Sequence, residues 1–397
     1  MVKPFAYSII VMMFFLLVEF IFSKVKKKKV FEFSDTLTNL ACGVMERTFF
    51  LLFVVIYYTS FEFIYQHFAL FNIAVTWWSV ILLFLTVDFL WYWYHRAGHE
   101  INVLWAAHIT HHQSEEYNFS LSFRVSALQL IIRMFFWLWL PVVGFDPKVT
   151  TLIIGINAAY QFFIHTRLIG KLGFLENILV TPSHHRVHHG KNEQYIDKNY
   201  GGIFIIWDKL FGTFAEEKEE VSYGITKPLT SRNPINAWFH YYADLFGAAK
   251  HVSGWKNKLR IFFAGPETLG FYYDNIKTNN SPMPQEDKTL KFYLVVQFTI
   301  LTVLFFLAYF YNDNLPFSVI VIVSSFVIYS SLSLGFVLDR HKISFSLEAL
   351  RILFMSLAFV LVLWKLQHLD YAFLALMPLL VFLPWIIKRK AAFQKTV

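Results

Sequence analysis

The stretch "DFLWYWYHRAGHE", residues 88–100, decides how the rest of the chain is interpreted. It ends an apolar, aromatic run long enough to cross a membrane, and it carries two histidines four residues apart, His95 and His99. Residues four apart lie on one face of a helix, so both imidazoles can point at one centre. Asp88 and Tyr92 precede His95 on the same face. The stretch therefore predicts a membrane helix that ends in metal-binding side chains.

The composition favours one membrane domain over two soluble ones. Hydrophobic residues make up 56% of the 397 residues and charged residues only 16%, against about 25% charged in an average soluble domain. The net charge of +8 comes from basic residues beside apolar runs, which is typical of a membrane protein and not of a nucleic-acid-binding one. The single cysteine, Cys42, excludes an intrachain disulfide and a cysteine-rich metal site.

Apolar runs close to the length of a bilayer crossing, roughly 20 residues, recur along the chain. We predict spans at about 5–23, 41–64, 73–94, 291–311, 315–335, 347–365 and 371–388. A further pair, at about 125–144 and 149–166, is separated by the turn-like "GFDPK" and indicates a helical hairpin. The sequence therefore predicts an all-α, polytopic membrane helix bundle.

The chain is expected to have four regions. They are N-terminal membrane helices (1–72), a catalytic region (73–273), a linker (274–290) and a C-terminal region of four membrane helices (291–397). The linker is predicted from "DNIKTNNSPMPQEDKTL", which is polar and rich in turn-forming residues.

Basic residues predict the orientation of the bundle. The runs "KVKKKK" (24–29), "DRHK" (339–342) and "KRK" (388–390) fall on one side of the predicted topology, and the opposite connections "YQHFALFN" and "YNDN" contain no Lys or Arg. Lys and Arg are enriched in cytoplasmic loops. We therefore expect an integral, multi-pass membrane protein with every histidine cluster on its cytoplasmic face.

Nine of the 15 histidines fall in three short motifs, "HRAGH", "HITHH" and "HHRVHH". Spacings of three and four let the side chains of each motif point at one centre. The set is too large for one zinc ion, which takes four ligands, and it suits two metal ions. Imidazole binds zinc, copper, iron and nickel, so the ligand type alone does not choose the metal. The motif histidines are His95, His99, His108, His111, His112, His184, His185, His188 and His189.

Three side chains near these motifs have more than one interpretation, and a fourth, Asp88, has one. His165 ends an apolar run at the level of the motifs and is interpreted either as a metal ligand or as an interfacial residue. His184 precedes the H-x-x-H-H pattern and is interpreted as a ligand, as an orienting neighbour of a ligand or as a substrate contact. Glu100 is an acid–base or orienting group, or a solvated charge at a helix end. Asp88 is placed to orient a liganding imidazole through a hydrogen bond.

A metal pair at a membrane face, beside apolar helices, predicts a lipid substrate and O2 as the oxidant. Iron with open coordination positions activates dioxygen, and apolar walls keep water from the oxidising species. A zinc peptidase is excluded because "HEINV" lacks the second histidine of H-E-x-x-H. A metal transporter or sensor is the alternative of another class. Transporters place ionisable residues near the bilayer midplane, whereas these histidines lie at helix ends.

Residues from about 80 to 215 resemble the fatty acid hydroxylase/sterol desaturase superfamily of membrane diiron enzymes. The resemblance rests on H-x3-H followed by two H-x2-H-H motifs, on "TPSHHRVHHGKN" (181–192) and on "DKNYGGIFIIWDKLFGTF" (197–214). Similarity to the ether-lipid-cleaving members lies in "HE" (99–100), "EEYNFSLSFR" (115–124), "IDKNY" (196–200) and the additional C-terminal helices.

The resemblance implies a site and a reaction. Two iron ions would be held by His95, His99, His108, His111, His112, His185, His188 and His189, and Glu100 matches a glutamate that the ether-lipid enzymes need. Oxygen would be inserted at the carbon beside the ether oxygen of an alkylglycerol, which releases a fatty aldehyde and a glycerol derivative. Tetrahydrobiopterin would supply the electrons, whereas other members use cytochrome or ferredoxin-like partners.

Two points stay open within this resemblance. A sterol or fatty-acyl hydroxylase or desaturase with the same diiron core is the alternative enzyme. Several superfamily hydroxylases also have another H-x3-H before the last motif, where this chain has Gln161 and His165. Gln161 then makes a water-bridged metal contact, or the site has fewer protein ligands.

Overall fold

The structure is a computed structural model that describes residues 3–273 and 288–393. Within these residues all named elements are helices, and strand pairing is limited to two isolated bridges. The all-α prediction is confirmed. The linker predicted at 274–290 lies mostly outside the described residues.

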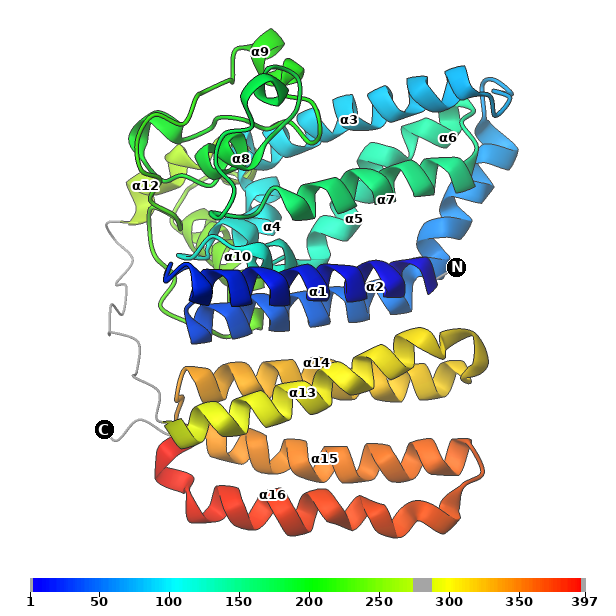
Figure 1. Ribbon diagram of the computed structural model, residues 1–397, viewed down its shortest axis with the longest axis vertical. Coiled ribbons are helices and arrows are strands. Elements are labelled where there is room, and N and C mark those ends of the chain that lie inside the picture. Colours follow the sequence, from blue (N-terminus) through cyan, green and yellow to red (C-terminus); the bar gives the residue numbers. More distant parts are fainter. Residues whose placement is uncertain (1–2, 274–287, 394–397) are drawn as a thin grey trace.

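Seven helical segments are long and apolar enough to cross a membrane, and they correspond to the seven long apolar runs. They lie roughly side by side in stacked layers (Figure 1). The helices are α1 (Lys3–Val25), α2 (Phe33–Phe68), α3 (Trp77–Glu100), α13 (Lys288–Phe310), α14 (Phe317–Leu338), α15 (Ser344–Lys365) and α16 (Leu376–Lys388), the last preceded by the 3₁₀ helix η5 (Leu369–Ala375).

The hairpin expected at 125–144 and 149–166 is built from three shorter helices, α5 (Ala127–Trp137), α6 (Trp139–Val143) and α7 (Pro147–Phe163). The turn between α6 and α7 requires Gly144. Its φ of +114° favours glycine, and a Cβ there would lie 1.9 Å from the carbonyl oxygen of Phe71.

Most of the remaining elements form a cap at one end of the bundle, on the side of α4 (Figure 1). Its helices are α4 (Asn102–His112), α8 (Pro182–His188), α9 (Ile206–Phe211), α10 (Pro234–Lys250), α11 (Trp255–Phe263) and α12 (Glu267–Tyr273). The other 3₁₀ helices are η1 (Phe119–Phe123), η2 (Gly173–Asn177), η3 (Glu193–Tyr195), η4 (Asn312–Asn314) and η6 (Lys390–Phe393).

Local sequence sets the positions of the histidine-bearing helices. α3 begins with a capping box between Thr76 and Ser79, and α8 begins with Thr181 as its N-cap and Pro182 in its first turn. Ile101 has an extended backbone, so it ends α3 and lets α4 turn back beside it. The break brings the last turn of α3 against α4.

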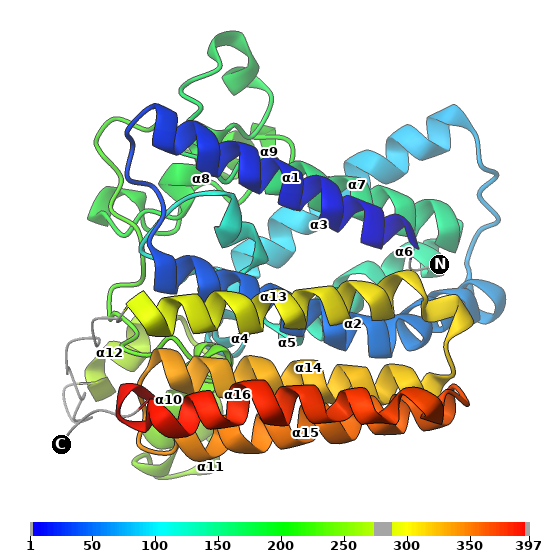
Figure 2. The ribbon, with the colours of Figure 1, turned by 60° about the horizontal axis from the view of Figure 1, so that its bottom comes forward.

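The C-terminal helices share a core with the N-terminal ones. One apolar cluster joins buried side chains of α2, such as Leu37 and Val44, to side chains of α13 and α14, such as Leu301 and Val337. Figure 2 shows α13 lying alongside α2. The C-terminal region therefore packs directly on the N-terminal helices. The division of the chain into four regions stays a prediction.

The basic runs all follow helix ends that lie at the same end of the bundle as the cap. Residues 24–29 end α1, 339–342 follow α14 and 388–390 end α16 (Figure 1). Asp339 accepts hydrogen bonds from the Ser231 hydroxyl and the Arg232 backbone amide, both in the cap. The basic residues and the histidines are thus on one side of the bundle. That this side is cytoplasmic stays a prediction.

Candidate metal centre

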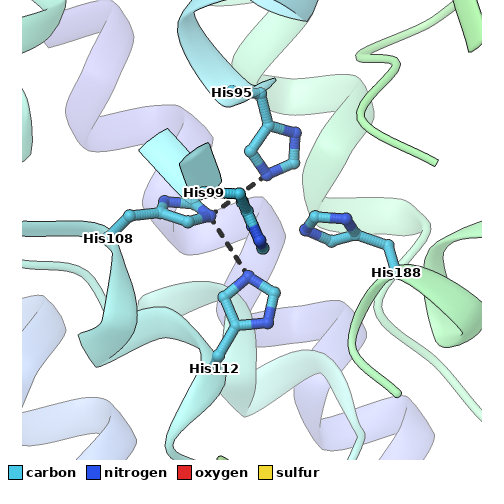
Figure 3. A group of neighbouring side chains, drawn as sticks. All are labelled: His95, His99, His108, His112 and His188. Atoms are coloured by element: carbon cyan, nitrogen blue, oxygen red, sulfur yellow. Dashed lines mark hydrogen bonds between the residues drawn. The ribbon is translucent and has the colours of Figure 1, made fainter. Parts of the chain in front are cut away.

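Nine of the ten histidines predicted as ligands lie in two adjacent groups. The nitrogen atoms that each group offers lie within 4.8 Å of one another. The first group contains His95 and His99 from α3, His108 and His112 from α4, and His188 from α8. The second group contains His111 from α4, His165 after α7, and His185 and His189 from α8 and its C-cap. Figure 3 shows the imidazoles of the first group around one point.

Each H-x2-H-H motif divides between the two groups, which differs from our expectation that each motif serves one centre. His108 and His112, four residues apart, share a face of α4, and His111 points to the other group. On α8, His185 and His189 share a face and His188 points away. Around a helix, a side chain three residues along lies about 60° to one side of the first, and a side chain four residues along lies about 40° to the other side. The second and third histidines of the motif therefore point in different directions. The motif therefore serves two neighbouring centres at once.

Distances between nitrogens match those around a metal ion. His108 Nε2 lies 3.1 Å from His95 Nε2 and 3.2 Å from His112 Nε2. In the second group His165 Nε2 lies 3.1 Å from His111 Nε2 and 3.0 Å from His185 Nε2. Metal–nitrogen bonds of roughly 2.0–2.1 Å at right angles place neighbouring nitrogens about 3 Å apart. Both groups therefore fit a metal ion held by imidazole Nε2 atoms.

The buried imidazoles also have the chemistry of metal ligands. Nε2 of His99 and Nε2 of His188 are buried and have no hydrogen-bond partner among the described residues, although buried polar atoms are normally satisfied. Burial, and then repulsion from neighbouring imidazoles, lowers the pKa of His108, His112 and His188 well below its ordinary value. The rings are neutral at physiological pH, which leaves a lone pair for a metal.

The two groups touch. The rings of His112 in the first group and His189 in the second are stacked with centroids 4.4 Å apart. The centroid of His111 lies 4.6 Å from that of His189 and 5.7 Å from that of His108. The residues of the two groups would therefore hold two metal ions at neighbouring sites.

One loop, residues 197–200, orients three imidazoles of the first group. The Lys198 carbonyl lies 2.9 Å from His188 Nδ1, and the Tyr200 carbonyl lies 2.8 Å from His95 Nδ1. The Asp197 carboxylate lies 3.5 Å from His99 Nδ1. Such acceptors fix the tautomer, so that Nε2 faces the metal. The loop lies within segments that carry the family resemblance, but its contacts with the three imidazoles were not predicted from the sequence.

The backbone of this loop explains its residue types. Asp197 has φ 58° and Asn199 φ 56°, a left-handed conformation that Asp and Asn adopt more readily than other non-glycine residues. The Asn199 amide donates hydrogen bonds to the carbonyls of His184 and Ala215. Two short polar residues around Lys198, directly before "YGG", are the signal that could have identified a tight supporting turn.

Fewer imidazoles of the second group than of the first have an oxygen acceptor at Nδ1. His165 Nδ1 lies 2.6 Å from the backbone carbonyl of Gln161. Nδ1 of His111 and Nδ1 of His185 are buried and have no partner among the described residues. The two groups thus differ in ligand number and in the oxygen atoms behind the ligands.

Asp88 and Gln161 belong to one hydrogen-bond network behind the site. The Gln161 side chain donates to Asn157, which donates to Asp88. Asp88 also accepts from the backbone amides of Ile203 and Phe204. Neither side chain has a hydrogen bond to a liganding imidazole among the described contacts. Asp88 instead fastens the loop after Tyr200 to α3, and Gln161 supports His165 through its backbone.

Glu100 and His184 lie apart from both groups. Glu100 is about half exposed at the end of α3 and forms an ion pair of 2.8 Å with Arg96. His184 is buried, its Nδ1 lies 3.3 Å from the Thr181 backbone nitrogen and 3.2 Å from the Leu179 carbonyl, and it completes the capping box of α8. The structure therefore does not bring either side chain to the imidazole nitrogens.

Two cavities reach the histidines from opposite sides. The larger has a volume of about 720 Å³, lies among the cap elements and reaches His99, His112, His188 and His189. The smaller, of about 90 Å³, lies within the bundle and reaches His95 and His108 of the first group and His111, His165 and His185 of the second. The centre thus separates a cap cavity from a bundle cavity.

Comparison with known proteins agrees with this site. The fatty acid hydroxylase family profile matches residues 80–213, which confirms the superfamily resemblance. The chain is 39% identical to human alkylglycerol monooxygenase over 338 residues, which cover 80% of this chain and 74% of that protein. It is 35% identical to the Xenopus tropicalis protein (85% and 78%) and 37% identical to the Danio rerio protein (80% and 73%) of the same name. No solved structure matches the chain.

Proposed function

This chain belongs to the alkylglycerol monooxygenase family, within the fatty acid hydroxylases, and from that premise we propose that it is a membrane-bound diiron monooxygenase that cleaves ether lipids. Its membership supports a lipid-hydroxylating oxidoreductase in a membrane. We propose three further features: a diiron centre, O2 as the oxidant, and a fatty aldehyde and a glycerol derivative as the products.

The observation that carries the proposal is the pair of adjacent imidazole groups. A group of five histidines exceeds the four ligands of a zinc site, and no cysteine accompanies it. Imidazole suits iron, and two neighbouring ions fit groups whose rings stack on each other. When bound, the two iron ions would supply the activation of dioxygen.

The proposed reaction balances as a monooxygenation. One oxygen atom of O2 enters the C–H bond of the alkyl carbon beside the ether oxygen, and the other leaves as water with two electrons and two protons from a donor. The resulting hemiacetal breaks its C–O bond and gives a fatty aldehyde and glycerol or a glycerol derivative. We propose tetrahydrobiopterin as the electron donor.

The residues of this chain divide the remaining tasks. The nine imidazoles hold the metals, and the loop 197–200 and the Gln161 carbonyl orient four of them. Buried aromatic side chains such as Trp91 and Phe162 exclude water from the bundle side. Glu100 is about half exposed and paired with Arg96, so its proposed acid–base or orienting role rests on the family resemblance.

A cleavage assay tests the proposal. Detergent-purified protein reconstituted with Fe(II) should release a fatty aldehyde from a 1-O-alkylglycerol with tetrahydrobiopterin and not without a donor. His188→Ala should lose this activity while keeping its fold, and His251→Ala, which changes an exposed histidine outside both groups, should keep it.

Other outcomes separate the alternatives. Hydroxylated sterol or fatty acid, formed with a cytochrome or ferredoxin donor in place of aldehyde, would support the second enzyme. Metal flux into vesicles without lipid oxidation would support a transporter. Full activity of His188→Ala would reject the site assignment.

A further inference from the structure

We propose that the alkyl chain of the lipid substrate reaches the metal centre from the bilayer, between α1 and α13, and lies in the bundle cavity and its outer continuation. The proposal rests on the proposed function, because it assigns a binding path to the same site. It also gives the C-terminal helices a role in the reaction.

Of the two cavities described above, the bundle cavity reaches the two imidazole groups more evenly. It reaches two histidines of the first group and three of the second. The cap cavity reaches three of the first group but only His189 of the second. A substrate carbon in the bundle cavity is therefore close to imidazoles of both groups.

The walls of the bundle cavity suit an alkyl chain next to a polar head. Its apolar lining residues include Met12 of α1, Phe123 of η1, and Ala158 and Phe162 of α7. Charged side chains line both cavities: Glu46, Arg47 and Arg133 line the bundle cavity, and Lys191, Asp197 and Glu267 are among those of the cap cavity. The apolar residues of the bundle cavity give an alkyl chain a surface to pack on, on the side of the molecule that α1 closes.

Polar groups of the bundle cavity lie where the glycerol part would be. Gln129 and Gln161 line it together with the imidazoles, and Arg133 stacks on Trp91 with its guanidinium 5.9 Å from the ring centre. The ether carbon is adjacent to the glycerol in an alkylglycerol. Hydroxyl groups near the metals therefore need hydrogen-bond partners, and these side chains can supply them.

A second small cavity continues the path toward the bilayer. It has a volume of about 30 Å³ and shares two residues, Arg47 and Phe123, with the bundle cavity. Arg47 is paired with Glu46 at 3.2 Å. The other lining residues come from α1, α2 and α13 and include Met13, Gly43 and Thr302. Phe123 and Arg47 are thus the side chains that the two cavities have in common.

Gly43 fixes the position of Phe123. A Cβ at Gly43 would lie 2.7 Å from Phe123 Cβ and 3.0 Å from the Phe123 carbonyl oxygen. The absent side chain lets η1 pack directly on α2, which holds Phe123 where it lines both cavities.

The outer cavity lies beside surfaces that face lipid. On α1, Ile10 and Phe14 are exposed, and on α13 Val303 and Leu307 are exposed. Both helices are apolar and long enough to cross a membrane, so these exposed side chains contact acyl chains. Figure 2 shows α13 beside α1 and α2 at the surface of the bundle. A lipid tail can thus pass from the bilayer to the outer cavity without crossing the cap.

Substitution on α13 tests the path by chain length. Thr302→Trp fills the outer cavity, so kcat/KM for a long-chain hexadecyl glycerol should fall about tenfold or more, as pockets that lose methylene contacts do. A short-chain octyl glycerol should be cleaved within about twofold of wild type. Val303→Trp, one residue along the helix and facing lipid, should change neither rate. Equal losses for both substrates in Thr302→Trp alone, or no loss, would overturn the path.

A label independent of catalysis separates this proposal from the proposed function. An alkylglycerol with a photoreactive diazirine at the chain end is bound to wild-type protein and illuminated, and labelled peptides are identified by mass spectrometry. Label on α1 and α13 supports the path, and label on α10, α12 or residues 224–230 overturns it. If the wild-type protein cleaves no alkylglycerol, the proposed function fails, and the position of the label still decides the path.

Discussion

At the scale of single residues, the site depends on side chains that sequence spacing reveals and on others that it does not. The histidines stand in motifs, so they can be predicted as ligands. Asp197 is 98 positions from the His99 ring that it contacts, and Glu100, which is adjacent in sequence, points away. Contacts between a helix and a distant loop depend on the fold, so they cannot be predicted from a single sequence.

Asp197→Asn should weaken iron binding by about 10–100-fold, the usual cost of removing an acceptor behind a liganding histidine. Asparagine tolerates the left-handed backbone at this position, so the change removes the charge and keeps the turn. Iron release to a chelator measures the effect. Lys198→Ala is the control, because Lys198 contacts His188 through its carbonyl. Faster iron release from the control than from Asp197→Asn would contradict the role of the carboxylate.

His184→Ala should keep both metals, and His185→Ala should lose metal from the second group. The two rings are adjacent in sequence, but only His185 directs Nε2 at another liganding imidazole. Loss of the His184 cap should cost about 1 kcal/mol of stability. Iron content per chain and thermal unfolding in detergent measure the two effects. Equal iron loss in both variants would show that His184 is a ligand.

At the scale of elements, the sequence predicts the helices better than their rotation. Apolar runs located the long helices because a bilayer crossing needs a minimum length. The division of each H-x2-H-H motif between two groups was not predicted, since it depends on how α4 and α8 are turned toward each other. In both helices the two histidines four residues apart belong to the same group. Which group each pair joins follows only from the positions of the two helices in the fold.

Gly202→Ala should destabilise the packing of the loop after Tyr200 on α3. A Cβ there would lie 2.7 Å from Asp88 Oδ1 and 2.9 Å from Trp91 Cδ1, and Asp88 is held by several donors and cannot easily move. Overpacking of this kind costs about 1–3 kcal/mol. Gly247→Ala on α10, where a Cβ would meet nothing within 4 Å, should be neutral or stabilising by up to about 1 kcal/mol. Thermal unfolding that ranks the two variants in the opposite order would refute this packing.

At the scale of the whole molecule, two helical parts are held together by apolar packing and the second part also contains a buried polar cluster. Glu348 and Arg351 of α15 form a fully buried ion pair of 2.6 Å, and Tyr293 of α13 and Ser333 of α14 donate to Glu348. Arg351 stands within an apolar run of the sequence. The side chains of this cluster come from three helices, α13, α14 and α15, which hydropathy alone cannot pair.

Glu348→Ala should destabilise the protein by about 3–5 kcal/mol, because it leaves the Arg351 guanidinium buried and unpaired. The double variant Glu348→Leu/Arg351→Leu should recover most of this stability, since apolar replacement of a buried pair is often neutral. Thermal unfolding in detergent measures both. Iron content should stay at the wild-type level in each folded variant, as the cluster has no contact with the histidines. A single variant as stable as wild type would contradict the account of the ion pair.

The most direct test of the central claim is the number and kind of metal sites in one chain. Metal-free protein in detergent is titrated anaerobically with Fe(II), and the bound iron is counted and examined by Mössbauer spectroscopy. Two groups of five and four imidazoles predict two Fe(II) per chain with different spectra, and one remaining iron in His188→Ala and in His185→Ala. Saturation of the wild-type chain at a single iron would contradict the account.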